Sequence, residues 1–516
     1  MKKNFYFMAA LLVAMIGCNK EPQMENNGIS SDDKVYMSFS IQTLTTRSAT
    51  DEEGETNSNA TPDYEVGKDY ENKISKVDIV LNNASTYVVA DDVVPSGSGD
   101  TYIASFNSLQ LQAGAEYEVY IYANCDAPAE KNLDAVSNAA IADMTKDNNF
   151  WMTNAYAAVS VKMPEKMSLY TSPATPLNLG SHYVERSMAR FDIRPYELYD
   201  FEIADNLWVT LTEGALINHS TDFYQLRRVS ADGTATNWEV GGVETPFNYV
   251  VDTEWERKMT GWNAKDVIAI KNNTLVSSSM LYPETWEWVE LPLANGEKDN
   301  WEGEDGENHL TQYYIWQYCK ENTIPGIEAQ QKGYTTGIVF KGRIETEQPA
   351  LMAAMETGET IYMFENILYG TWDNVKTAAA QSNAPATLVA AVDATEAALK
   401  IQTDPDVIYP DAYATNGFTG YSPDANGDYY TYYYYWNRHN DNGDNTKMGP
   451  MEFAVVRNNV YKICVDNISK LGHPTPGKDP DPDPENPDDP DESVNYYFNV
   501  TAKVLPWVVR VNHIEF

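Results

Sequence analysis

The chain has 516 residues, of which 76 are acidic and 36 are basic, giving a formal net charge of −40. A surface this negative repels nucleic-acid phosphates and anionic lipid headgroups, which argues against both as binding partners. Charged residues make up 22% of the chain and hydrophobic residues 43%. The chain can therefore bury real cores, and its length predicts two folded domains.

The first residues have the form of an export signal. Lys2 and Lys3 precede a 12-residue apolar run, Phe5 to Ile16, which is too short to span a bilayer but fits the core of a signal peptide. The next residues complete Met-Ile-Gly-Cys, the bacterial lipobox pattern, so we expect residues 1–17 to be removed and Cys18 to be acylated. The alternative is an ordinary secretory signal with a chance cysteine. We find no later run of apolar residues long enough for a spanning helix, so the lipid would be the only membrane attachment.

Alternating patterns typical of half-buried strands dominate the rest of the chain. The first such strand is predicted where Val35, Met37, Phe39 and Ile41 alternate with polar residues. Turn-rich segments separate the strands, which predicts an all-β, sandwich-type architecture. Similar patterns occur at 74–81, 117–123, 189–193, 207–211, 336–344 and 452–465.

Only one stretch is clearly helical, and two segments resist folding. The alanine-rich residues 374–401 predict two short helices beside the second sandwich, because Pro385 interrupts the run. Residues 48–61 are polar and acidic, so they cannot bury enough surface to offset the entropy of ordering. Residues 474–492 form an acidic, proline-rich spacer that should be extended. We place a domain boundary near residue 230.

Beyond the spacer the chain ends in a β-rich tail. One apolar run has alternating residues from Phe498 to Val504 and a second lies beyond Pro506. A stiff tether that carries an apolar strand calls for a partner strand elsewhere. Which part of the tail pairs with that partner stays open. The second run consists of Trp507, Val509, Val511, Ile514 and Phe516.

The sequence lacks the usual signatures of catalysis and metal binding. We predict no catalytic residue, no metal site and no cofactor, because the metalloprotease, phosphate-loop and nucleophile-elbow patterns are missing. Residues 440–444 resemble a calcium loop but have their glycine and glutamate out of place, so we interpret them as a hairpin turn. Apart from Cys18, the cysteines at 125, 319 and 464 are interpreted as buried thiols rather than bridges. In the tyrosine-rich run 429–435, alternate rings should line a core.

Several stretches resemble the fimbrilin family of Bacteroidetes-type (type V) pili, in particular the shaft subunit of short fimbriae. The similar segments follow the family order: the lipobox, Lys34-Val-Tyr-Met-Ser-Phe-Ser, Arg47, Val184-Glu-Arg-Ser-Met-Ala-Arg-Phe-Asp, and Gly449-Pro-Met-Glu-Phe-Ala-Val-Val-Arg-Asn-Asn-Val-Tyr. The likeness is thin from about 250 to 330. It implies two transthyretin-like β-sandwiches with short helical insertions and a C-terminal donor strand.

The resemblance also implies a route of assembly. An outer-membrane lipoprotein precursor reaches the cell surface, an arginine-specific protease cuts after Arg47, and the mature subunit begins at Ser48. A strand of an identical subunit then replaces the lost strand by β-augmentation. Arg47 suits such a cut because it lies between a predicted strand and a segment expected to be disordered.

The sequence thus predicts the structural subunit of a surface fimbria that supports adhesion. Its partners would be identical subunits, accessory tip and anchor proteins, the protease, and a host or bacterial receptor. Two alternatives are a lipid-anchored tip or accessory adhesin that binds a glycan or host receptor, and a surface hydrolase. The expected divisions are 1–17 signal peptide, 18–47 propeptide, 48–230 and 231–474 sandwiches, 475–492 spacer and 493–516 tail.

Overall fold

The computed structural model describes most of the chain between residues 33 and 508. Predictions for residues outside the described ranges, including the turn at 440–444 and the spacer, are not tested by the structure. The described ranges are 33–43, 65–96, 100–195, 199–230, 238–241, 249–253, 286–292, 313–323, 335–401, 411–439, 451–476 and 498–508.

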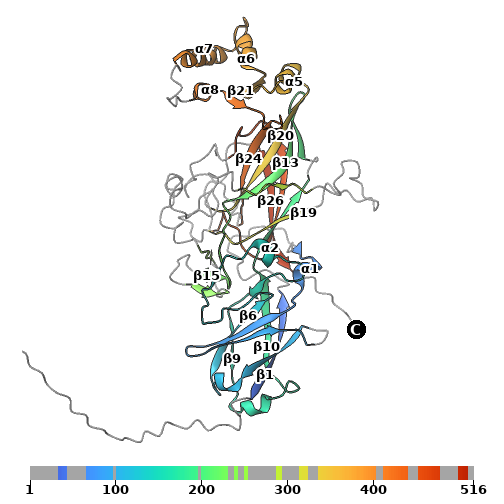
Figure 1. The fold of residues 1–516 in the computed structure, drawn as a ribbon, viewed down its shortest axis with the longest axis vertical. Helices are drawn as coiled ribbons and strands as arrows, with labels where there is room; N and C mark the ends of the chain where they lie inside the picture. Colours follow the sequence, from blue (N-terminus) through green and yellow to red (C-terminus); the bar gives the residue numbers. More distant parts are fainter. Residues whose placement is uncertain are drawn as a thin grey trace, which may run out of the picture.

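The described part of the molecule is elongated and built mainly of strands (Figure 1). An N-terminal β-sandwich lies at one end, a C-terminal β-sandwich follows it, and a small helical unit lies at the far end. The predicted all-β class with two sandwiches and short helical insertions is therefore confirmed. Each alternating pattern overlaps an observed strand, although residues 452–458 of the last pattern precede the strand that begins at Asn459.

The N-terminal sandwich is one curved sheet around one core. Its strand order is β4-β3-β6-β8-β10-β1-β5, with β9 paired to β6. A bridge between Pro95 and Tyr102 joins the two ends of this order, so the sheet wraps around its core. The strands are β1 (Lys34–Thr43), β3 (Val77–Asn82), β4 (Tyr87–Val93), β5 (Thr101–Asn107), β6 (Glu116–Ala123), β8 (Met152–Asn154), β9 (Val159–Lys162) and β10 (Leu177–Arg186).

Small elements join and flank these strands. Strand β3 is buried along its whole length because both of its faces are covered. On its outer face, Val80 belongs to a hydrophobic cluster with Leu226 and Val240, which come from a later part of the chain. Alternation alone does not reveal a strand that is covered on both faces. The flanking elements are β2 (Glu65–Val66), α1 (Asp69–Asn72), η1 (Ser108–Gln110), β7 (Val136–Ser137), α2 (Ile141–Met144) and η2 (Met167–Tyr170).

The C-terminal sandwich packs two sheets over a second core. One sheet has the order β19-β11-β25-β26-β2 and the other β12-β13-β20-β24, with β18 paired to β13. Apolar side chains from both sheets share this core. The strands are β11 (Ala189–Arg194), β12 (Asp200–Ala204), β13 (Leu207–Ile217), β18 (Val289–Glu290), β19 (Tyr314–Cys319), β20 (Gly337–Thr346), β24 (Tyr430–Trp436), β25 (Asn459–Ile468) and β26 (Phe498–Val508).

The helices that the alanine-rich stretch predicted are present at the far end of the molecule. The run is interrupted before Pro385, as expected, and gives α6 and α7. These helices pack on a small sheet, and aromatic side chains fill the space between them. The unit consists of α5 (Pro349–Glu356), β21 (Ile361–Phe364), β22 (Ile367–Tyr369), α6 (Trp372–Ala379), α7 (Ala386–Ile401), α8 (Ala412–Thr415) and β23 (Thr419–Tyr421).

The chain passes from the first sandwich to the second earlier than the sequence suggested. Strand β10 ends at Arg186 in the N-terminal sheet, and β11 begins at Ala189 in a C-terminal sheet. Residues 223–230 and 238–240 then lie beside the N-terminal sandwich. A single cut at residue 230 therefore does not separate the sheets. The returning strands are β14 (Phe223–Tyr224), β15 (Arg228–Ser230), β16 (Trp238–Val240) and β17 (Tyr249–Val250).

The expected cysteine and tyrosine environments are observed. Cys125, Cys319 and Cys464 are free and buried. In β24, Tyr433 faces the C-terminal core, whereas Tyr432 and Tyr434 belong to a separate aromatic cluster on the other face of the sheet. The alternation of rings between two faces follows from the period of a strand.

Candidate functional site

Strand β1 occupies the middle of the N-terminal sheet. It pairs in parallel with β10, from Met37 opposite Leu177 onward, and antiparallel with β5, from Lys34 opposite Asn107 onward. We call this position between β5 and β10 the β1 site. A strand with hydrogen-bonded neighbours on both sides leaves two exposed edges when it is removed.

The four apolar side chains that the sequence singled out all point into the core. Val35 and Met37 are fully buried, and Phe39 and Ile41 nearly so. Their burial contributes roughly 1.5–3 kcal/mol each to holding β1 in place. The opposite face of β1 is partly open, and there Ser40 donates a hydrogen bond of 2.7 Å to Ser181 on β10.

A bulge in β10 shapes the wall of the β1 site. Ser38 pairs with Asn178 but Ser40 with Ser181, so β10 has one extra residue between them. Gly180 takes up this bulge with a φ of +88°, and its amide donates to the Asn178 side chain at 2.9 Å. The extra residue reverses the alternation, so that Leu179 and then His182 both face the core.

The other residues singled out from the sequence are placed only in part. Cys18, Arg47, Ser48, Val509, Val511, Ile514 and Phe516 lie outside the described residues. Trp507 lies on β26, whose backbone is described. The structure therefore brings together the four β1 residues and leaves the cleavage and lipidation sites as predictions.

The tail strand does have a partner, which the sequence did not identify. Strand β26 pairs antiparallel with β25 of the same chain, from Ile468 opposite Phe498 to Asn459 opposite Pro506. Within the described ranges, the other edge of β26 pairs with β2, where Glu65 lies opposite Trp507. The described part of the tail thus completes its own C-terminal sandwich instead of standing apart from it.

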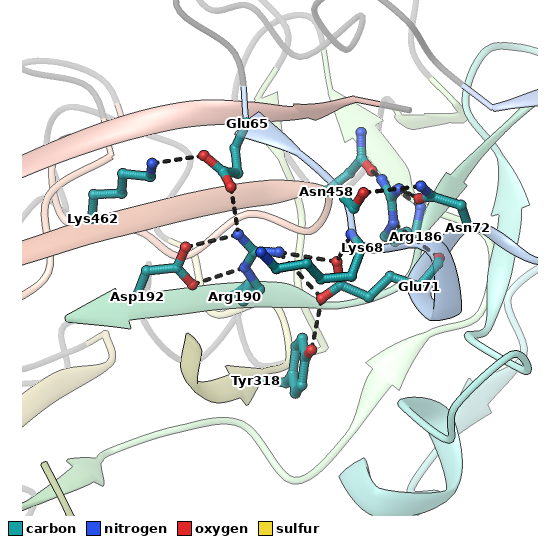
Figure 2. A network of polar contacts seen from close by, with 11 residues as sticks. Glu65, Lys68, Glu71, Asn72, Arg186, Arg190, Asp192, Tyr318, Asn458 and Lys462 are labelled. Atoms are coloured by element: carbon teal, nitrogen blue, oxygen red, sulfur yellow. Dashed lines mark hydrogen bonds and ion pairs between the residues drawn. The ribbon is translucent and has the colours of Figure 1, made fainter. Parts of the chain in front are cut away.

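A buried polar network joins the segment after the predicted cut to both sandwiches (Figure 2). Arg190 on β11 lies at its centre, with its guanidinium 2.7 Å from Asp192, 3.0 Å from Glu71 and 3.1 Å from Glu65. Lys462 on β25 contacts the second oxygen of Glu65 at 2.6 Å. Glu65 and Glu71 belong to β2 and α1, so this short segment is clamped onto the C-terminal sandwich.

The charges in this network compensate one another. Burial lowers the pKa of Arg190, but the carboxylates of Asp192, Glu71 and Glu65 outweigh that effect and raise it overall. Burial, together with the negative charge of Glu71, raises the pKa of Tyr318. Tyr318 therefore keeps its proton and donates to Glu71 at 2.7 Å. Sequence reasoning missed this network because its members are scattered over about 400 residues and have no common spacing.

Replacing Arg190 by methionine should destabilise the whole chain. The substitution leaves Glu71 and Asp192 buried without their cation, and breaking a buried pair in this way costs about 3–5 kcal/mol. Urea unfolding of the purified chain measures the loss. The matched control is Arg343→Met, because its pair with Glu345 is exposed and such pairs contribute about 0–1 kcal/mol. Equal losses in the two variants would show that the network does not hold the molecule together.

The described residues offer neither a metal site nor a membrane span. Among them, no group of three or more histidine, cysteine, aspartate or glutamate side chains is arranged to hold a metal ion. No helix in the described ranges is both long and apolar enough to cross a bilayer.

Two family models match separate regions of the chain. Residues 36–187 match the major fimbrial subunit protein (FimA) family. Residues 427–513 match the C-terminal family described as major fimbrial subunit protein type IV, fimbrillin. The first region contains the β1 site, and the second contains β24, β25 and β26.

Solved structures with distant similarity include two from Porphyromonas gingivalis. A fimbrilin is 15% identical, with 93% of this chain and 99% of that chain covered and a TM-score of 0.39. The tip fimbrial protein Mfa3, with a C-terminal truncation, is 10% identical, with 92% and 100% covered and a TM-score of 0.34. No curated protein sequence gives a significant match.

The two family matches support a structural role in fimbriae. The resemblance to fimbrilins inferred from the sequence is confirmed, since residues 36–187 and 427–513 belong to the fimbrial subunit families that match them.

Proposed function

We propose that this chain is the repeating subunit of a fimbrial shaft that polymerises by donor-strand exchange. The carrying observation is that β1, a central and buried strand, precedes Arg47 in the chain. One cut at Arg47 separates this strand covalently from the rest of its sheet. After the cut, no peptide bond joins β1 to the rest of the subunit, and a strand of another subunit can replace β1 in the β1 site.

The precursor is exported as a lipoprotein with Cys18 acylated. The lipid holds the subunit at the outer membrane, and an arginine-specific protease releases it by cutting between Arg47 and Ser48. While β1 remains attached, its backbone and its four apolar side chains complete the sheet. Exchange before cleavage is disfavoured because the attached strand is always available to return.

The donor is the tail, residues 493–516. A strand from the end of one subunit that enters the sheet of the next makes a head-to-tail joint. Such a joint does not close on itself and therefore builds an open fibre. Receptors and accessory tip or anchor proteins would then act at the ends or along the surface of the fibre.

Maturation can be tested on purified filaments. N-terminal sequencing should begin at Ser48, because only subunits that have lost the covalent link to β1 can accept a donor strand. Mass spectrometry of the same sample should find no lipid-modified Cys18. Polymers whose subunits retain acylated Cys18 would contradict the proposed route. If each fibre contains a single copy of this chain at one end, a tip role is favoured instead.

A further inference from the structure

In the β1 site, the Phe39 ring contacts two aromatic rings of the flanking strands. Tyr102 on β5 stacks on Phe39 with ring centroids 5.4 Å apart and planes 16° apart. His182 on β10 meets Phe39 edge-on, at 6.3 Å and 73°. Phe39 therefore lies between two rings that belong to the flanking strands, and these two rings stay when β1 leaves.

His182 is buried but incompletely satisfied. The residue is 2% exposed, and its Nε2 atom has no hydrogen-bond partner among the residues that the structure describes. Burial lowers the pKa of His182, and a backbone interaction at Leu179 offsets this only in part. The ring is thus neutral near pH 7. The Phe39 side chain, which meets the His182 ring, has no polar atom and cannot supply the missing hydrogen bond.

We propose that Trp507 of a neighbouring subunit replaces Phe39 between the rings of Tyr102 and His182 and donates its indole N–H to Nε2 of His182. This inference rests on the proposed strand exchange and names the residue that sets its register. Trp507 is the only tryptophan of the tail. An indole is a donor without an acceptor, which suits Nε2 in the neutral tautomer that carries its proton on Nδ1. Phe498 and Phe516 have no such donor.

The neighbouring proline supports this register. A proline inside a central strand removes a ladder hydrogen bond, and it is tolerated mainly at bulges. With Trp507 in place of Phe39, Pro506 falls in the position of Ser38 or Ser40. These two residues flank the bulge that Gly180 makes in β10. Proline and bulge thus coincide.

The flanking positions favour one strand direction. If the incoming strand runs opposite to β1, then Leu505, Val509 and Val511 take the positions of Ile41, Met37 and Val35. If it runs the same way, Lys503 takes the fully buried position of Val35, where an unpaired charge is costly. The geometry points to a donor antiparallel to β10. Leu505 and Pro506 must then leave β25, while residues 498–504 can remain paired there.

The hydrogen bond can be tested with a double-mutant cycle on the full-length chain after arginine-specific cleavage. Trp507→Phe removes the donor and keeps a ring, and His182→Phe removes the acceptor and also keeps an aromatic ring. Each should shorten the half-life of the strand-exchanged dimer in urea about tenfold, as followed by its band on a gel. This is the size expected for a hydrogen bond to a buried group. The two together should be no worse than either alone. Phe516→Leu is the tail control and should change the half-life less than about twofold.

Additive losses, or no loss in either variant, would overturn the role of Trp507. A photo-crosslinker placed at Tyr102 gives a second measurement that does not depend on how His182→Phe folds. It should attach to the neighbour's peptide that contains Trp507. Ladders with crosslinks elsewhere in the tail overturn the register but leave strand exchange standing. If the cleaved wild-type chain forms no ladder, both the exchange and the inference fail.

Discussion

Arg47→Ala is expected to abolish polymerisation while leaving the monomer folded. Without the cut, β1 stays covalently attached, and its four buried side chains keep it in its sheet with a total of roughly 6–12 kcal/mol. The uncleaved chain should show the same melting temperature as the uncleaved wild type. Treatment with an arginine-specific protease followed by electrophoresis in denaturant should give a ladder for the wild type and a single band for the variant.

Arg47→Lys distinguishes the effect of cleaving the peptide bond after residue 47 from the effect of the positive charge at that residue. This variant should resist an arginine-specific protease and form no ladder, yet it should polymerise after brief treatment with a protease that also cuts after lysine. Ladders from Arg47→Ala, with intact residues 18–47 in every band, would contradict the mechanism. They would mean that exchange does not require separation of β1.

The sequence predicted strand β1 well but not its place in the sheet. Alternation at Val35, Met37, Phe39 and Ile41 is a local signal, and it fixes which face is buried. The position between β5 and β10 depends on pairing with residues about 60 to 140 positions away. No local pattern contains that pairing. The resemblance to fimbrilins supplied the expectation of exchange, and the registers supply the reason why the strand is central.

Local exceptions to alternation were not predictable. His182 would face outward if β10 alternated without interruption, and only the positive φ of Gly180 turns it inward. A glycine in a strand indicates that a bulge is possible, but it does not say that one occurs. The network around Arg190 was missed for a related reason. Its members meet only after β2, α1, β11 and β25 have been brought together.

The tail shows the same limit. The apolar run at Phe498–Val504 predicted a strand, and a strand is present. Because the proline-rich spacer suggested separation, the sequence did not predict that β26 would pair with β25 of its own chain. The open edge of β25 explains this pairing, since unpaired backbone groups beside a buried core are costly.

Two truncations should distinguish the role of the tail in its own C-terminal sandwich from its proposed role as a donor strand. Deleting residues 509–516 leaves β26 on β25, so the melting temperature of the monomer should not change. It removes Val509 and Val511 from the donor, whose burial contributes roughly 1.5–3 kcal/mol each, so ladders should be lost. Deleting residues 493–516 also removes β26. That variant should lose ladders and, in addition, melt at a lower temperature. The edge of β25 is then unpaired, and the contact of Val500 with the core is lost.

Val509→Asp gives a test without truncation. An aspartate at this position would bring an unpaired charge into the dry site left by β1, and such burial is strongly unfavourable. Ladders should therefore disappear while the monomer melts as the wild type does. Val159→Asp is the matched control, since Val159 is 44% exposed on β9 and its substitution should leave assembly intact. Thermal melts and denaturing gels of the cleaved chains decide the outcome.

If the chain without residues 509–516 still forms denaturant-resistant ladders, the donor lies elsewhere. If that chain fails to fold, the end of the tail belongs to its own sandwich, and strand exchange through it is excluded.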